Sequence, residues 1–181
     1  MKTAILSIGT ELLFGQITNT NTVYLSQKLN MLGYDVMYHY TVGDNPERVR
    51  DMIRLAFQDC DLVITTGGLG PTQDDLTKEM VCQVMGDELV MMDEVMSELE
   101  SYFEKLGRPM TENNKKQAYV PSRAEVFINH EGSAPGFALE KDGKYVICMP
   151  GPPREMTSMF EDSVMPYLQS MSEDVIYYRM L

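Results

Sequence analysis

A glycine-rich segment followed by two aspartates is the part of this sequence best suited to chemistry on a phosphate. Gly67, Gly68 and Gly70 fall within four residues, and Asp74 and Asp75 follow closely. Glycine backbone N–H groups can hold a phosphate because no side chain keeps the anion at a distance. Two adjacent carboxylates would repel that anion, so we expect a divalent cation between them, and hard oxygen ligands suit Mg²⁺ or Mn²⁺. The simpler alternative is a tight turn in which Asp74 or Asp75 caps the next helix.

This segment differs from the commonest phosphate-binding loops. It lacks the Lys-Ser/Thr pair of a P-loop, and it does not have the G-x-G-x-x-G spacing of dinucleotide-binding loops. The apolar run at residues 62–64 before it is short and rich in β-branched residues, which indicates a buried strand. Residues 76–85 after it have the pattern of a helix. The segment is therefore expected to join a strand to a helix.

Two more acidic residues follow predicted strands in the same way. Residues 3–8 precede Glu11, and residues 34–42 precede Asp44. Helical patterns separate the three strands, and this β-α-β-α-β alternation is typical of a parallel sheet with helices on both faces. Ligands of such sheets bind beyond the carboxyl ends of the strands. Glu11 and Asp44 are thus candidates for the same site; the alternatives are a solvated loop charge and an ordinary cap or turn residue.

The second half of the chain predicts an antiparallel addition to this sheet. An Asp-Gly pair between residues 137–140 and 144–149 is the strongest two-residue hairpin signal. A proline-rich turn at residues 150–153 then leads into an expected closing helix over residues 154–168. The polar stretch at residues 111–118 is predicted to be a short helix. We expect that helix to lie at the surface, with a ligand wall as the alternative.

Size and composition limit the possible functions. The 181 residues, 44% of them hydrophobic and 23% charged, suit one sizeable core, and we expect one domain over residues 1–170. The net charge of −12 argues against nucleic acid or an anionic membrane as a main partner, because both need a basic face. Residues 171–181 contain a strand pattern at 175–178, which either adds to a sheet edge or a partner or is the start of a truncated connecting segment.

The cysteines and the amino terminus indicate a cytoplasmic protein. Cys60, Cys82 and Cys148 have no paired spacing, so we expect reduced core cysteines. The sequence shows no signal peptide and no apolar run near ~18 residues, so we expect no membrane span.

Several short motifs run in order from Met1 to about Leu168. They lie in residues 9–21, 42–44, 66–77, 114–118, 129–137 and 150–156, and the Gly-Gly-Leu-Gly-Pro-Thr block at 67–72 is the most specific of them. Together they resemble the amino-terminal domain of the CinA family of competence/damage-inducible proteins. More distantly, the Gly-Gly-x-Gly…Asp-x-Thr core is similar to the molybdopterin-binding proteins of the MogA, MoaB and gephyrin type.

The resemblance implies a fold and three possible functions. The fold would be a three-layer α/β/α sandwich with its ligand pocket at the glycine loop. The first function is metal-dependent hydrolysis of ADP-ribose to AMP and ribose 5-phosphate. The second is molybdopterin binding or adenylyl transfer, and the third is a non-catalytic nucleotide-binding or dimerisation module. Family members form homo-oligomers, and a dimer is the commonest outcome for soluble proteins.

The resemblance also implies roles for individual residues. Catalytic roles fall to Asp75, Asp44 and Glu11, and divalent-metal binding falls to Asp74, Asp75 and Asp44. The residues expected to bind the nucleotide or pterin ligand are Gly9, Thr66, Gly67, Gly68, Leu69, Gly70, Pro71, Thr72, Thr77, Pro150, Gly151 and Glu155. Many family members have aspartate where this chain has Thr10 and Asn19, which would weaken the site if either aspartate served the metal.

Overall fold

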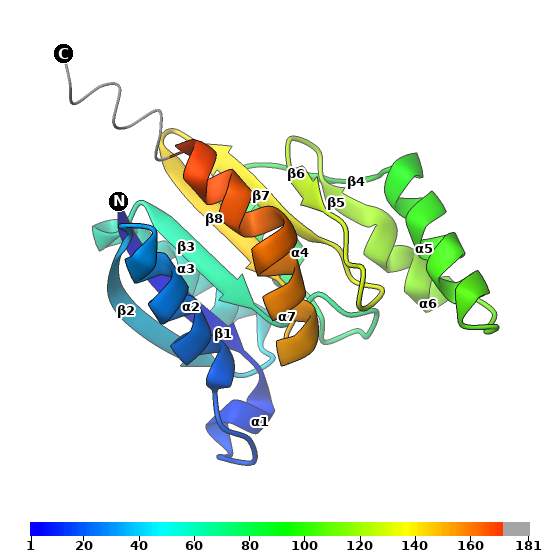
Figure 1. Cartoon of the computed structure of the whole chain (residues 1–181), viewed down its shortest axis with the longest axis horizontal. Helices are drawn as coiled ribbons and strands as arrows, with labels where there is room; N and C mark the ends of the chain where they lie inside the picture. The colour runs from blue at the N-terminus through cyan, green and yellow to red at the C-terminus, as the bar shows by residue number, and fades with distance from the viewer. Residues whose placement is uncertain (172–181) are drawn as a thin grey trace.

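The computed structural model describes residues 1–171 and shows a six-stranded sheet between two layers of helices (Figure 1). The strand order is β2-β1-β3-β8-β7-β6. The first four strands run parallel, whereas β7 is antiparallel to both β8 and β6. The strand bounds are β1 (Lys2–Ile8), β2 (Asp35–Val42), β3 (Leu62–Thr66), β6 (Glu125–Phe127), β7 (Gly136–Lys141) and β8 (Lys144–Met149). The predicted mostly parallel sheet with an antiparallel hairpin is confirmed.

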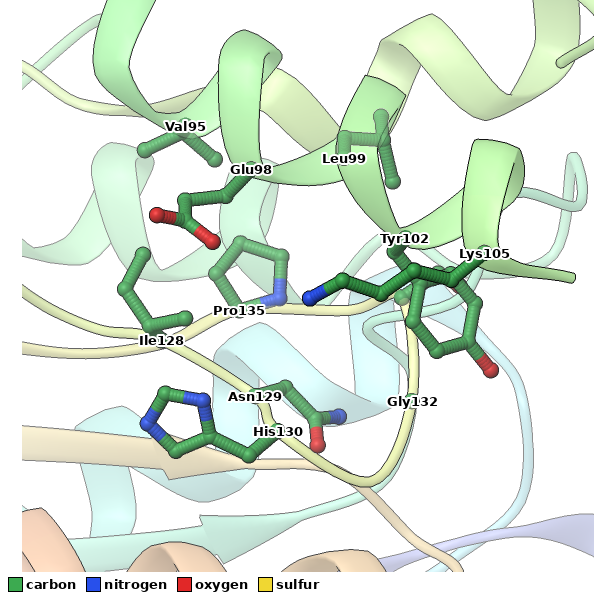
Figure 2. A pocket seen from close by; sticks show the side chains of 11 residues that line it. Val95, Glu98, Leu99, Tyr102, Lys105, Ile128, Asn129, His130, Gly132 and Pro135 are labelled. Atoms are coloured by element: carbon green, nitrogen blue, oxygen red, sulfur yellow. The ribbon is translucent and has the colours of Figure 1, made fainter.

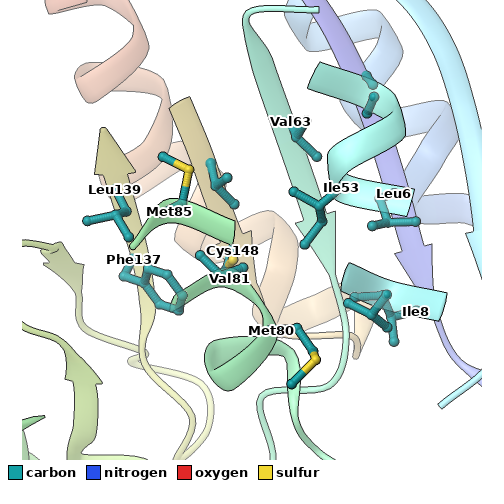
Figure 3. Close-up of a cluster of buried hydrophobic side chains, with 14 of the residues drawn as sticks. Leu6, Ile8, Ile53, Val63, Met80, Val81, Met85, Phe137, Leu139 and Cys148 are labelled. Carbon is teal, nitrogen blue, oxygen red and sulfur yellow. The ribbon is translucent and has the colours of Figure 1, made fainter. Parts of the chain in front are cut away.

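One face of the sheet is covered by α3 (Pro46–Asp59) and α4 (Thr77–Met85). Figure 3 shows the apolar cluster between these helices and the strands, which includes Leu6 of β1, Ile53 of α3 and Val81 of α4. These three side chains are fully buried. Burial of this kind contributes roughly 1.5–3 kcal/mol for each large apolar side chain.

The opposite face is covered by α2 (Thr20–Met31) and by α7 (Pro153–Met159), which continues through a π-helical turn at Phe160–Val164 to residue 171. Ile5 packs on this side with Leu25 of α2. Because neighbouring residues of a strand point to opposite faces, Ile5 and its neighbours in β1 serve two separate apolar clusters. The three-layer sandwich is therefore present as predicted.

A second, two-stranded sheet lies beside this sandwich. It pairs β4 (Leu89–Met91) with β5 (Tyr119–Pro121) in antiparallel fashion. Between them the chain forms α5 (Asp93–Lys105), α6 (Glu112–Lys115) and a 3-10 turn, η1 (Lys116–Ala118). Neither strand was predicted, because three residues are too few to show a period. The single helix expected at residues 111–118 is two short pieces, α6 and η1.

A short helix, α1 (Thr10–Leu13), follows β1 directly. The three cysteines are buried and unpaired, as predicted. Along residues 1–171, no helix combines the length and the apolar character needed to cross a bilayer. The strand expected at residues 175–178 lies outside the described residues.

Candidate functional site

The four parallel strands end side by side at one edge of the sheet. Ser7 of β1 lies opposite both Thr41 of β2 and Thr66 of β3, and Thr66 lies opposite Met149 of β8. The loops that leave these strands therefore gather at one place. They enclose a cavity of about 610 Å³, a size typical of small-molecule sites.

Most of the predicted site residues line this cavity. They are Gly9, Glu11, Asp44, Gly67, Gly68, Leu69, Gly70, Pro71, Thr72, Asp74, Asp75, Pro150, Gly151 and Glu155. Thr66 and Thr77 are the predicted site residues that do not contribute to its wall. Gln117 and Ser133 line it as well, although the sequence analysis did not select either of them.

The charged side chains of the cavity are all acidic. Glu11, Asp44, Asp74, Asp75 and Glu155 contribute five carboxylates, and no lysine, arginine or histidine is among the described lining residues. An anion placed among these groups would be repelled unless a cation compensated the charge. The cavity therefore needs backbone N–H groups and an added cation to hold a phosphate.

The glycine loop supplies such N–H groups. Gly67 has φ +104°, and a Cβ there would lie 2.2 Å from the carbonyl oxygen of Ile8, so only glycine fits. The Gly67 N–H donates to Met149 O at 3.0 Å and is not available to a ligand. The N–H groups of Gly68, Leu69 and Gly70 donate to no acceptor within residues 1–171. Three N–H groups are thus free, whereas that of Gly67 is not.

Thr77 has a structural role instead of the ligand contact expected for it. It is 1% exposed, and its hydroxyl donates to Gly67 O at 3.1 Å. Its N–H donates to Gly68 O at 3.2 Å. The N–H and the hydroxyl of Thr77 are therefore both used within the glycine loop and are not available to a phosphate. Thr66 is 3% exposed and lines a small side recess of the cavity region, with Asn21 and Gly151.

Asp75 does not cap α4, so the helix-cap part of the simpler alternative is wrong, whereas the tight turn of that alternative is present. The N-cap residue of α4 is Leu76, and no side chain caps that helix. The Asp75 Oδ2 atom instead accepts hydrogen bonds from the N–H and the hydroxyl of Thr72, at 2.9 and 2.5 Å. A Cβ on Gly70 would lie 2.7 Å from that oxygen, so the carboxylate is folded back against the glycine loop. The other oxygen, Oδ1, has no partner among the described residues.

Asp44 and Glu11 line the same cavity from the loops after β2 and β1. The Asp44 Oδ2 atom accepts a hydrogen bond from the Thr10 N–H at 2.9 Å, and the Asp44 N–H donates to the Thr10 hydroxyl at 3.0 Å. This reciprocal pair ties Asp44 to the start of α1, whereas the cap of the helix that follows Asp44 is Asn45. Glu11 is exposed and folds over Gly9, where a Cβ would lie 2.5 Å from its Oε1.

The carboxylates do not form a complete metal site on their own. Within residues 1–171, no three His, Cys, Asp or Glu side chains stand close enough to hold an ion. The expected trio of Asp44, Asp74 and Asp75 shares one cavity but is not gathered around one point. This arrangement fits a cation of the Mg²⁺ type, which usually takes one or two carboxylates and completes its shell with water and substrate phosphate.

Two lysines fix the segment that carries Gln117. The Lys78 ammonium is 1% exposed and donates to the carbonyls of Lys116 and Tyr119, at 2.8 and 2.6 Å. Lys116 reaches the other way and donates to the carbonyls of Thr72 and Asp75, at 3.2 and 2.5 Å. The 3-10 turn η1 is thereby tied to the end of the glycine loop. The segment expected at the surface forms part of the ligand-cavity wall.

A smaller cavity of about 100 Å³ adjoins the larger one (Figure 2). Ser133 lines both. Asn129, on the wall of the smaller cavity, donates to Glu155 Oε2 at 2.7 Å. In Figure 2 the side chain of Lys105 extends from α5 toward the loop around Pro135. The larger cavity remains the candidate site because it alone contains the glycine loop and the aspartates.

Lys78 makes stability depend on pH in a way that can be measured. Burial lowers the pKa of its ammonium to about 8, from 10.5, against smaller opposing effects of Glu79 and others. Between these values the unfolded chain binds more protons, so the contribution of this group to stability rises with pH. We expect the free energy of unfolding of the wild type, minus that of Lys78→Met, to rise by roughly 2–3 kcal/mol from about pH 7 to 10. Urea titrations of both proteins would check this, and a flat difference would contradict it.

The sequence pattern of the family described as "Probable molybdopterin binding domain" matches residues 4–170. Among curated proteins, a competence-damage inducible protein of Caldicellulosiruptor saccharolyticus is 51% identical over 181 residues. A CinA-like protein of Dictyoglomus thermophilum is 50% identical over the same length. Both alignments cover all of this chain, which spans 44% of each relative.

Solved structures agree with this match. A crystal structure of CinA from Thermoplasma acidophilum superposes with a TM-score of 0.81 at 30% identity, over 96% of this chain and 97% of that one. MoaB from Thermus thermophilus, a molybdopterin biosynthesis enzyme, gives a TM-score of 0.61 at 17% identity, over 93% of this chain and 96% of that one. The second likeness concerns the fold alone.

Proposed function

This chain belongs to the family of probable molybdopterin-binding domains. We propose that its larger cavity binds a nucleoside diphosphate sugar and hydrolyses the diphosphate bond with a divalent metal. The proposed substrate is ADP-ribose, which water would split at the diphosphate into AMP and ribose 5-phosphate. One observation carries the proposal. Three free N–H groups and five carboxylates line the same cavity, with no cationic side chain among the described lining residues.

The glycine loop would hold the diphosphate. The N–H groups of Gly68, Leu69 and Gly70 are fixed in place before a ligand arrives, because Gly67 and Thr77 anchor the loop. Fixed N–H dipoles stabilise negative charge without reorganisation during the reaction. Phosphoryl chemistry depends on such positioning and charge compensation more than on a protein nucleophile. No covalent intermediate on the protein is therefore needed.

Asp75 would be the main residue that holds the metal, joined by Asp74, Asp44 or Glu11 around the cavity. Thr72 holds one oxygen of Asp75 and leaves the other free, so the carboxylate is oriented before anything binds. When bound, a divalent ion supplies positive charge to the phosphate oxygens and lowers the pKa of a bound water. Without a metal, the acidic wall would repel the diphosphate. With a metal bound, the same carboxylates would hold the cation that compensates the charge of the diphosphate.

Molybdopterin binding or adenylyl transfer is the second candidate. The family description favours it. A pterin phosphate presents the same kind of anion to the glycine loop, so the cavity geometry suits both ligands. Fold alone does not choose between the two functions. The presence of two adjacent aspartates next to the loop is the reason for placing metal-assisted hydrolysis first.

The test is metal-dependent product formation. The purified chain is incubated with ADP-ribose and with Mg²⁺, Mn²⁺, Co²⁺ or EDTA, and AMP and ribose 5-phosphate are resolved by chromatography. We expect AMP only in the presence of a metal, because the acidic cavity otherwise repels the diphosphate. No AMP with any of the three metals would overturn the proposed hydrolysis. Binding of molybdopterin without turnover of ADP-ribose would then favour the second candidate.

A further inference from the structure

Gln117 has a buried side-chain amide that nothing in the described protein satisfies. The residue is 1% exposed and lines the larger cavity. Neither its Nε2 nor its Oε1 has a hydrogen-bond partner among residues 1–171. An unpaired buried amide is costly, because both its donor and its acceptor lose their water. The amide is thus a donor and an acceptor placed side by side at the wall of a ligand site.

The backbone on both sides of Gln117 is held rigidly. The Lys78 ammonium binds the carbonyls of Lys116 and Tyr119, which bracket it. Lys116 in turn binds the carbonyls of Thr72 and Asp75. The backbone of Gln117 is therefore held by hydrogen bonds at a fixed position relative to the end of the glycine loop. A ligand whose phosphates lie on that loop would meet the amide at a set distance from its charged end.

We propose that Gln117 recognises the edge of the planar heterocycle of the ligand, where a hydrogen-bond donor stands next to an acceptor. This inference rests on the proposed function. It names the residue that would contact the heterocycle, which is the part of the substrate that the glycine loop does not touch. A phosphate offers only acceptors, so it would leave Oε1 unsatisfied. A planar amide instead matches a planar edge, as glutamine matches N6 and N7 of adenine. Adenine and pterin rings both have an edge of this kind.

The experiment compares ligands with and without a heterocycle on matched variants. Gln117→Met removes the donor and the acceptor at nearly constant length, and Gln83→Met makes the same change on the exposed face of α4. Binding of ADP-ribose, a 6-substituted pterin phosphate, ribose 5-phosphate and inorganic pyrophosphate is measured by calorimetry with Mg²⁺ present. The melting temperature of each variant without ligand is measured alongside.

For Gln117→Met we expect affinity for the ligand with a heterocycle to fall about tenfold or more. Affinity for pyrophosphate and ribose 5-phosphate should stay within about twofold, and the ligand-free melting temperature should stay level or rise. Gln83→Met should match the wild type throughout. Whichever of ADP-ribose and the pterin binds the wild type more tightly identifies the ring.

Four results would overturn the inference. Equal loss for pyrophosphate would mean that Gln117 serves the phosphate cradle, and equal loss for ribose 5-phosphate would mean that it binds the sugar. A melting temperature lowered by more than about 5 °C would mean that the amide is structural. Unchanged binding of ADP-ribose and of the pterin would mean that water satisfies it. Failure of the wild type to bind any of the four ligands is different, because it overturns the proposed function itself.

Discussion

Asp75→Asn is expected to lower the rate of ADP-ribose hydrolysis at least about a hundredfold while nucleotide binding remains measurable. Asparagine keeps an oxygen that can accept the two hydrogen bonds from Thr72, so the turn after the glycine loop should keep its shape. What the variant loses is the negative charge that would hold the metal. Initial rates of AMP formation at saturating metal, together with calorimetric binding of AMP, would separate the two effects.

Asp142→Asn is the matched control. It makes the same chemical change in the turn between β7 and β8, and Asp142 is not among the residues that line the cavity. Its rate should equal that of the wild type. If Asp75→Asn also kept its rate, Asp75 would only shape the turn and the proposed metal chemistry would be wrong. If Asp75→Asn lost pyrophosphate binding and melted at a lower temperature, its role would be structural.

The sheet could be predicted because each of its signals is local. The apolar runs before Gly9 and Gly67 have the length of buried strands, and a glycine follows each of the first three strands. The Asp-Gly pair at 142–143 forms the expected hairpin between β7 and β8. Once the strands are parallel, geometry alone gathers their carboxyl ends. This is why Glu11, Asp44 and Asp75, far apart in sequence, all line one cavity.

The parts that could not be predicted depend on contacts between distant segments. Gln117 belongs to a polar stretch with no apolar face, and a buried lysine from another helix is what draws that stretch against the glycine loop. The hydrogen bond from the Gly67 N–H to Met149 likewise requires β8 to lie next to β3. Neither contact can be predicted from a periodic pattern in the sequence. The residue types were visible, but their partners were not.

Gly67→Ala should lower the free energy of unfolding by about 3 kcal/mol or more. The added methyl group would lie 2.2 Å from the carbonyl oxygen of Ile8, a backbone atom at the end of the neighbouring strand β1. A flexible side chain could move aside, but Ile8 O can retreat only if the ends of β1 and β3 separate. The residue also has φ +104°, which disfavours any side chain. Urea denaturation followed by circular dichroism would measure the change.

Gly107→Ala separates the two contributions to this effect. Gly107 follows α5 with φ +63°, and a Cβ there would have nothing within 4 Å. That variant has the cost of a positive φ, about 1 kcal/mol, without the clash. Both variants could lose the same free energy of unfolding. The contact with Ile8 would then be readily relieved, and the close packing of β1 against the glycine loop would not be what holds the loop in place. A clearly larger loss at Gly67 would show that the free N–H groups of Gly68, Leu69 and Gly70 are positioned by the close approach of two backbones, which no substitution of a lining side chain could replace.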